Sequence, residues 1–160
     1  MKKFTLNMKM CFSLLMCVIL MAFSSQLNFD EHTAFLQKMF KEHYDEDNSL
    51  LDIKRYELNV TNNGFCRYKR FFTNGKVEYF SFNLVKFKDL DYYGTEKKGD
   101  LYLRTRGDDV IVQTYNDKRG GDVDSMASYM SIPLKNIEAH DLIAILERMS
   151  KMNARLLIQK

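Results

Sequence analysis

Apolar residues recur at helical spacing in two segments of the chain. In the first segment these positions are Phe35, Leu36, Met39 and Phe40. Asn28 and Glu31 precede them at the spacing of a capping box, which predicts a helix over residues 29–44. In the second segment the apolar positions are Leu142, Ile145, Leu146, Met149 and Met152. With Asn136 as its candidate N-cap, this stripe predicts a C-terminal helix.

Between the two helices, apolar and polar residues alternate with the period of two that is typical of β-strands. The pattern predicts six strands, at residues 53–60, 65–72, 76–87, 101–106, 110–115 and 125–134. Turn-forming residues separate consecutive strands at 74–75 and 107–109, and the polar segment 89–100 is predicted to form a loop.

The order of the elements, helix, six strands and helix, predicts the fold class. Short turns between consecutive strands favour an antiparallel meander of about six strands, flanked by an N-terminal and a C-terminal helix, in an α+β domain. A sheet curled into a partly open barrel is the alternative, and in the order of its elements alone it is similar to pleckstrin-homology-like domains. No motif in the chain identifies a family.

The hairpin centred on residues 74–75 carries the most informative pattern. A two-residue turn would place Lys69 opposite Phe80, and it would place Arg67 opposite Phe82. Basic and aromatic side chains would then share one face, which suits contact with a planar or anionic ligand. Because the opposite face also holds aromatic residues, either both faces are covered or one is an exposed surface for a partner. The predicted ligand-binding residues are Arg67, Lys69, Phe80 and Phe82, with Tyr92 and Tyr93 from the neighbouring loop.

The N-terminus predicts a secretory signal peptide that is removed after Ser24. Lys2, Lys3 and Lys9 are followed by an apolar run at residues 10–23 and then by small residues. As a helix this run would span roughly 21 Å, which is short of the ~30 Å hydrocarbon core of a membrane. An uncleaved anchor is therefore the weaker alternative, and no stable membrane span is expected after cleavage.

Removal of residues 1–24 changes the charge and the cysteine content of the protein. The whole chain carries 24 basic and 21 acidic residues, and three of the basic residues lie in the signal segment. Residues 25–160, predicted to form a single α+β domain, therefore carry 21 of each, which argues against nucleic acid as a partner. Cys66 is the one cysteine left, so no internal disulfide is expected. We expect it to be buried in a strand, with an intermolecular disulfide or a reactive thiol as the alternatives.

The sequence offers little catalytic chemistry. His32, His43 and His140 do not have the spacing of metal ligands, so no metal is expected, and no cofactor is expected either. The sequence also contains no nucleophile elbow. The favoured hypothesis is an exported, non-enzymatic binding module, periplasmic, on the cell surface or secreted. Its predicted partner is a protein, a peptide or an anionic glycan of the cell envelope. The alternative is a small secreted hydrolase that uses His32 or His43 with a carboxylate such as Glu42.

Overall fold

The computed structural model of the chain describes residues 16, 29–47 and 52–158. The chain divides into two compact units, residues 1–31 and 32–160. Residues 29–31 of the first unit are helical. The predicted signal peptide and Asn28 lie outside the described residues, apart from Met16, so the cleavage site and the boundaries of the mature domain stay predictions. All the strands of the described residues lie in the second unit.

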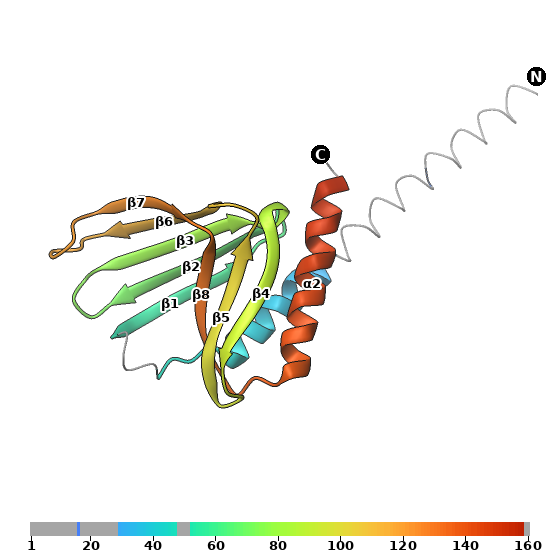
Figure 1. The fold of residues 1–160 in the computed structure, drawn as a ribbon, viewed down its shortest axis with the longest axis horizontal. Helices are drawn as coiled ribbons and strands as arrows, with labels where there is room; N and C mark the ends of the chain where they lie inside the picture. Colours follow the sequence, from blue (N-terminus) through green and yellow to red (C-terminus); the bar gives the residue numbers. More distant parts are fainter. Residues whose placement is uncertain (1–15, 17–28, 48–51, 159–160) are drawn as a thin grey trace, which may run out of the picture. The chain divides into compact units, whose positions relative to one another are not determined.

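Two antiparallel sheets and two helical segments form the second unit, an α+β fold (Figure 1). The larger sheet has the order β1 (Ile53–Val60), β2 (Phe65–Phe72), β3 (Val77–Asn83), β6 (Val110–Tyr115) and β7 (Val123–Ala127). The smaller sheet has the order β4 (Phe87–Gly94), β5 (Lys98–Thr105) and β8 (Tyr129–Lys135). Its strands run across one end of the larger sheet (Figure 1). The helical segments are residues 32–43 and α2 (Ala139–Ile158).

The α+β class, the antiparallel pairing and a sheet that is not a closed barrel are confirmed. The described residues form eight strands rather than about six. β3 pairs with β6 instead of with the strand predicted next along the chain at residues 101–106, which is part of β5. The segment 89–100, predicted to be a loop, forms most of β4 and the start of β5. Its polar residues alternate because one face of the three-stranded sheet lies open to solvent, where Asp89 and Tyr93 are exposed.

The chain leaves the larger sheet through the short 3-10 helix η1 (Leu84–Lys86). Asn83 stabilises this corner, since its side chain accepts a hydrogen bond from the N–H of Val85 at 2.9 Å. From α2, the buried Asn153 donates from Nδ2 to the carbonyls of Leu84 at 2.5 Å and Phe87 at 3.3 Å. The corner therefore has its carbonyls satisfied inside the core, which explains how β3 ends and β4 enters another sheet.

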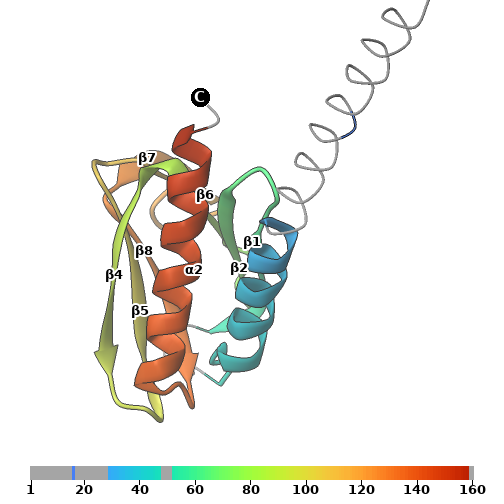
Figure 2. The same cartoon turned by 90° about the vertical axis from the view of Figure 1, so that its right-hand side faces the viewer.

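The helices pack on the sheets through the stripes that the sequence predicts. Fully buried side chains come from both sheets and both helical segments: Leu36, Phe40, Val60, Cys66, Tyr68, Phe82, Leu101, Leu103, Met130, Ile132, Leu134, Ile145, Met149 and Met152. α2 lies beside residues 32–43 (Figure 2), where the guanidinium of Arg148 is 4.9 Å from the ring centroid of Phe35. α2 begins at Ala139, three residues beyond Asn136, so Asn136 does not cap it.

The register of the β2–β3 hairpin differs from the prediction by one residue. Phe72 N–H donates to the carbonyl of Lys76 at 2.9 Å, which leaves residues 73–75 as a three-residue loop. Gly75 has a φ of 89° and donates to the carbonyl of Phe72, as expected for a three-residue hairpin loop that ends on a left-handed residue. A one-residue change in register exchanges which side chains share a face.

Candidate functional site

The structure does not bring the six predicted ligand-binding residues together. Phe80 faces Tyr68 and Phe82 faces Cys66, whereas Arg67 pairs with Ser81 and Lys69 with Tyr79. The prediction that Arg67 and Lys69 share a face with Phe80 and Phe82 is therefore wrong, because the hairpin loop has three residues rather than two. Phe82 is 2% exposed and belongs to the core.

Tyr92 and Tyr93 lie on the three-stranded sheet and point to opposite faces of β4. The Tyr92 hydroxyl donates to the carbonyl of Thr95 at 2.8 Å, and its ring lies against Gly99. Tyr93 is 59% exposed, with its ring centroid 5.2 Å from that of Tyr102. Tyr93 is therefore the more exposed of the two, and Tyr92 is half-buried.

Arg67 and Lys69 lie instead on what we call the outer face, the open side of the five-stranded sheet. Its basic, aromatic and aliphatic side chains are Arg55, Phe65, Arg67, Lys69, Phe71, Val77, Tyr79, Ile111, Tyr115 and Met126. The same register also places Glu57, Asn59, Ser81, Gln113 and Asp124 on this face. Ile111 and Met126 are cross-strand neighbours and are 39% and 53% exposed. The outer face thus combines basic, aromatic and aliphatic side chains. Of its aromatic residues, Tyr79 is the one that the predicted register places on the opposite face from Arg67 and Lys69.

Cations and rings are already in contact on the outer face. The guanidinium of Arg55 is 3.8 Å from the ring centroid of Phe71, and Lys69 Nζ is 4.9 Å from the same centroid. The guanidinium of Arg67 is 5.1 Å from the centroid of Phe65. Such contacts orient the long basic side chains over the sheet, so fewer conformations are lost when a partner binds. A hollow of about 440 Å³ lies at the hairpin end of this face, with Arg55, Phe71 and Val77 in its lining.

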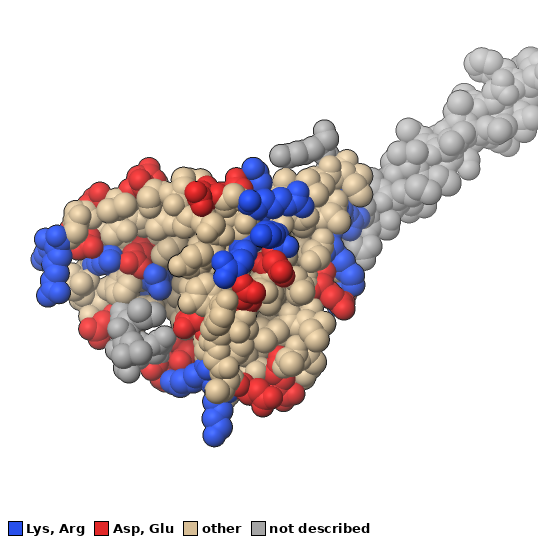
Figure 3. All heavy atoms as spheres, in the orientation of Figure 1, with Lys and Arg blue, Asp and Glu red and all other residues tan. Residues whose placement is uncertain are grey.

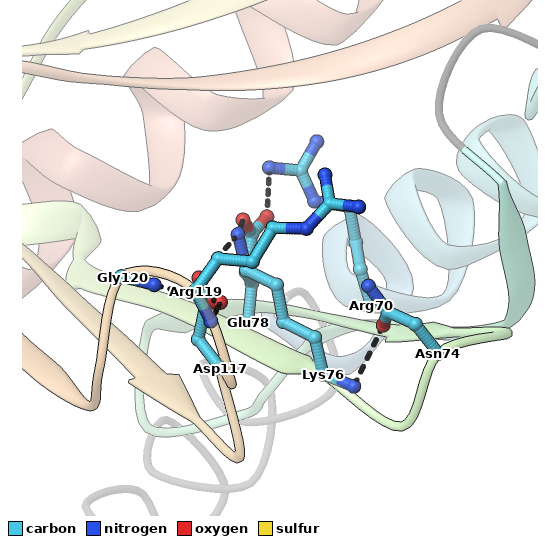
Figure 4. A network of polar contacts seen from close by, with 7 residues as sticks. All are labelled: Arg70, Asn74, Lys76, Glu78, Asp117, Arg119 and Gly120. Atoms are coloured by element: carbon cyan, nitrogen blue, oxygen red, sulfur yellow. Dashed lines mark hydrogen bonds and ion pairs between the residues drawn. The ribbon is translucent and has the colours of Figure 1, made fainter.

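The other side of the sheet, the inner face, ends in a polar network at its exposed end (Figure 4). Arg70 contacts Glu78 at 2.5 Å, and Lys76 Nζ lies 2.8 Å from Glu78 and 3.4 Å from Asp117. The contact with Glu78 raises the pKa of Lys76, and backbone N–H groups of Arg119 and Gly120 lower the pKa of Asp117. The network ties the β2–β3 hairpin to the β6–β7 loop, and the charges of Arg70, Lys76, Glu78 and Asp117 pair with one another.

Three tyrosines lie on the inner face between this network and the core. The hydroxyls of Tyr44 and Tyr68 are 2.7 Å apart, and the ring of Tyr44 stacks on Tyr56 with centroids 3.5 Å apart. Burial raises the pKa of both Tyr44 and Tyr68. The two hydroxyls therefore stay protonated in the folded protein and satisfy each other.

The groups considered for catalysis are dispersed. Cys66 is buried, as predicted, and burial raises the pKa of its thiol to about 12, which disfavours the thiolate that a nucleophile needs. His43 Nδ1 lies 3.2 Å from the carbonyl of Lys135, His32 Nδ1 lies 2.9 Å from Arg148, and the exposed Glu42 pairs with Lys38. Among the described residues, no group of three or more His, Cys, Asp or Glu side chains is arranged to hold a metal ion.

Lysines and arginines lie among acidic residues on the side of the molecule shown in Figure 3 rather than in one basic patch. Within residues 16, 29–47 and 52–158, no helix has the length and apolar character needed to cross a bilayer. No protein-family model matches the chain, and the searches of curated proteins and of solved structures found no match either. The residues and geometry of the chain itself are therefore the basis for any proposal about its function.

Proposed function

We propose that this protein is an exported, non-enzymatic binding module whose outer face takes a protein partner. The observation that carries the proposal is the grouping of Arg67 and Lys69 with Phe65, Phe71 and Tyr79 on a sheet face that no described element covers. Aromatic residues, methionine and arginine are enriched at protein interfaces. The signal peptide predicted at residues 1–24 supports a periplasmic, cell-surface or secreted location.

The aliphatic part of the outer face favours a protein over an anionic glycan. Ile111 and Met126 extend the aromatic residues toward β7, and Tyr115 adds a ring that is 42% exposed. Exposed apolar groups beside polar ones are typical of surfaces that bury area against another protein. Arg55 also pairs with Glu57 at 2.6 Å, which leaves fewer unpaired cations than a polyanionic glycan would need. The hollow beside Phe71 offers a place for one anchoring side chain of the partner.

The test uses the full-length chain with a C-terminal affinity tag, expressed in a bacterial host and recovered from its envelope. Intact mass spectrometry shows whether residues 1–24 have been removed. The recovered protein then captures partners from an envelope extract, in parallel with the double variant Arg67→Ala/Tyr79→Ala. We expect this variant to capture at least tenfold less partner than the parent protein, with a melting temperature close to that of the parent.

The matched control is Arg106→Ala/Tyr93→Ala, which removes an exposed tyrosine of β4 and an exposed arginine that directly follows β5. The control variant should capture as much partner as the parent protein does. Loss of capture in the control alone would move the site to the three-stranded sheet, and equal capture by all three proteins would overturn the proposal. Retention on an anionic glycan resin that falls steeply with salt would replace the protein partner with a glycan.

A further inference from the structure

β1 is an open edge of the five-stranded sheet, and its main-chain groups alternate in direction. Thr61 N–H donates to the carbonyl of Phe65 at 2.8 Å, and Phe65 N–H donates to Thr61 Oγ1 at 3.0 Å, so these two residues take a hydrogen-bonded position of the ladder. In an antiparallel ladder such pairs recur at every second residue, so Asn59 and Glu57 also bond to β2. The intervening residues Tyr56, Leu58 and Val60 must direct their N–H and C=O groups away from β2.

The neighbouring helical segment confirms this direction at one position only. Gln37 Nε2 donates to the carbonyl of Val60 at 3.2 Å, so Val60 does face outward and is capped by a side chain. Within the described part of the chain, the main-chain groups of Tyr56 and Leu58 have no such partner. An uncovered edge with free donors and acceptors is a template for another strand.

A hollow of about 710 Å³ lies beside these free groups. Tyr56, Leu58 and Asn59 form one of its walls, and the helical segment forms the other. The helical segment therefore leaves a gap beside Tyr56 and Leu58, whereas at Val60 its Gln37 side chain occupies the edge of the sheet. The space that remains is of the size that binds a short segment of chain.

The wall that the helix contributes is basic. Lys38, Lys41 and Glu42 line it, and Glu42 pairs with Lys38 at 3.9 Å. Lys41 makes no ion pair with any described residue, so one positive charge faces the hollow uncompensated. A strand added to β1 would direct every second side chain toward this wall, where an acidic residue would meet Lys41.

We infer that the β1 edge binds an extended, acidic peptide segment of a partner protein, which adds to the five-stranded sheet as a further strand. Main-chain hydrogen bonds to Tyr56 and Leu58 provide the affinity, and the helical wall selects acidic side chains. This site differs from the outer face: it recognises backbone rather than a folded surface, and it does not rest on the function proposed above.

The first test is the selection of displayed random eight-residue peptides on the full-length chain, with Lys41→Glu as the matched counter-target. We expect the enriched peptides to carry Asp or Glu at alternating positions and to bind Lys41→Glu at least tenfold more weakly. Binding should be unchanged in Arg67→Ala/Tyr79→Ala, which separates this site from the outer face. Failure to enrich any peptide, or enriched peptides that need Arg67 and Tyr79 instead, would overturn the inference.

The second test asks whether the peptide is a strand. In a β-strand only alternate amides bond to a given neighbour, so N-methylation at alternate peptide positions should weaken binding at least tenfold. Methylation at the intervening positions should change binding by less than twofold. Equal effects at both sets of positions would exclude strand addition.

Amide hydrogen exchange gives a readout on the protein itself. The N–H groups of Tyr56 and Leu58 should exchange rapidly in the free full-length chain and become protected when the selected peptide is added. If they are protected before any peptide is added, another part of this chain covers the edge. That result would overturn the inference of a partner protein.

Discussion

The two faces of the five-stranded sheet carry the same kinds of residue but have different roles. On β2, the inner residues Cys66 and Tyr68 are fully buried, whereas Arg67, between them, points outward and is exposed. Both faces contain aromatic rings with a cation beside them, Arg70 with Phe80 on the inner face and Arg67 with Phe65 on the outer. Composition therefore does not distinguish core from surface in this sheet; coverage by other elements does.

The inner face also changes along its own length. At one end Val60, Cys66 and Phe82 are packed into the core. At the other end Arg70 and Glu78 form an ion pair whose side chains are 16% and 15% exposed. The strands β4, β5 and β8 cross only one end of the sheet (Figure 1), so the far end is stabilised by polar contacts instead.

The largest difference in stability is expected between substitutions of Phe82 and of Arg67, two residues that a two-residue turn would place opposite each other. Phe82→Ala removes a core side chain and should lower the free energy of unfolding by about 3–5 kcal/mol. Arg67→Ala should change it by no more than about 0.5 kcal/mol, since Arg67 is exposed. Urea unfolding of the two variants measures both values, and similar losses for the two would contradict the register described above.

The tyrosine pair should give an intermediate effect. Tyr68→Phe leaves the buried Tyr44 hydroxyl without its partner and should cost about 1–3 kcal/mol, while Tyr44→Phe/Tyr68→Phe should cost less than the sum of the single changes. A double-mutant cycle by thermal unfolding measures this coupling. Additive single effects would show that the two hydroxyls do not depend on each other.

The same pair predicts a loss of stability at alkaline pH. Burial raises the pKa of Tyr44 and Tyr68 in the folded state, so above pH ~10 the unfolded chain releases these protons more readily than the folded one. The stability associated with the pair is full below that pH and is lost as pH rises further. Between pH 8 and 11 the parent should therefore lose more free energy of unfolding than Tyr44→Phe/Tyr68→Phe.

The smallest effect belongs to the exposed end of the inner face. Lys76→Met removes the bridge between Glu78 and Asp117 and should cost about 0.5–1 kcal/mol, because ion pairs open to solvent are weak. The loss should shrink in 1 M salt, where such pairs are screened. Lys88→Met, at an exposed lysine of β4, is the control and should have no measurable effect. A salt-independent loss in Lys76→Met would point to packing rather than charge.

Much of the fold follows from local patterns. The helical stripe with Ile145, Met149 and Met152 is buried as predicted, because a helix can turn only one face to a core. Alternation placed β1, β2 and β6 close to their observed bounds. The pairing of β3 with β6 was not predictable in this way, since it depends on a corner at η1 whose carbonyls bond to Asn153, 66 to 69 residues away.

For the candidate binding residues too, local sequence patterns predicted one part of the arrangement and the folded structure decided the other. The sequence by itself determined that basic side chains lie among aromatic ones on β2, that aromatic side chains recur on β3, and that a turn forms near Gly75. One further loop residue decided which of them share a face, because the side-chain period of a strand is two and any shift by one exchanges the faces. Only the tertiary structure decided which face is buried, since that depends on where the second sheet and the helices lie.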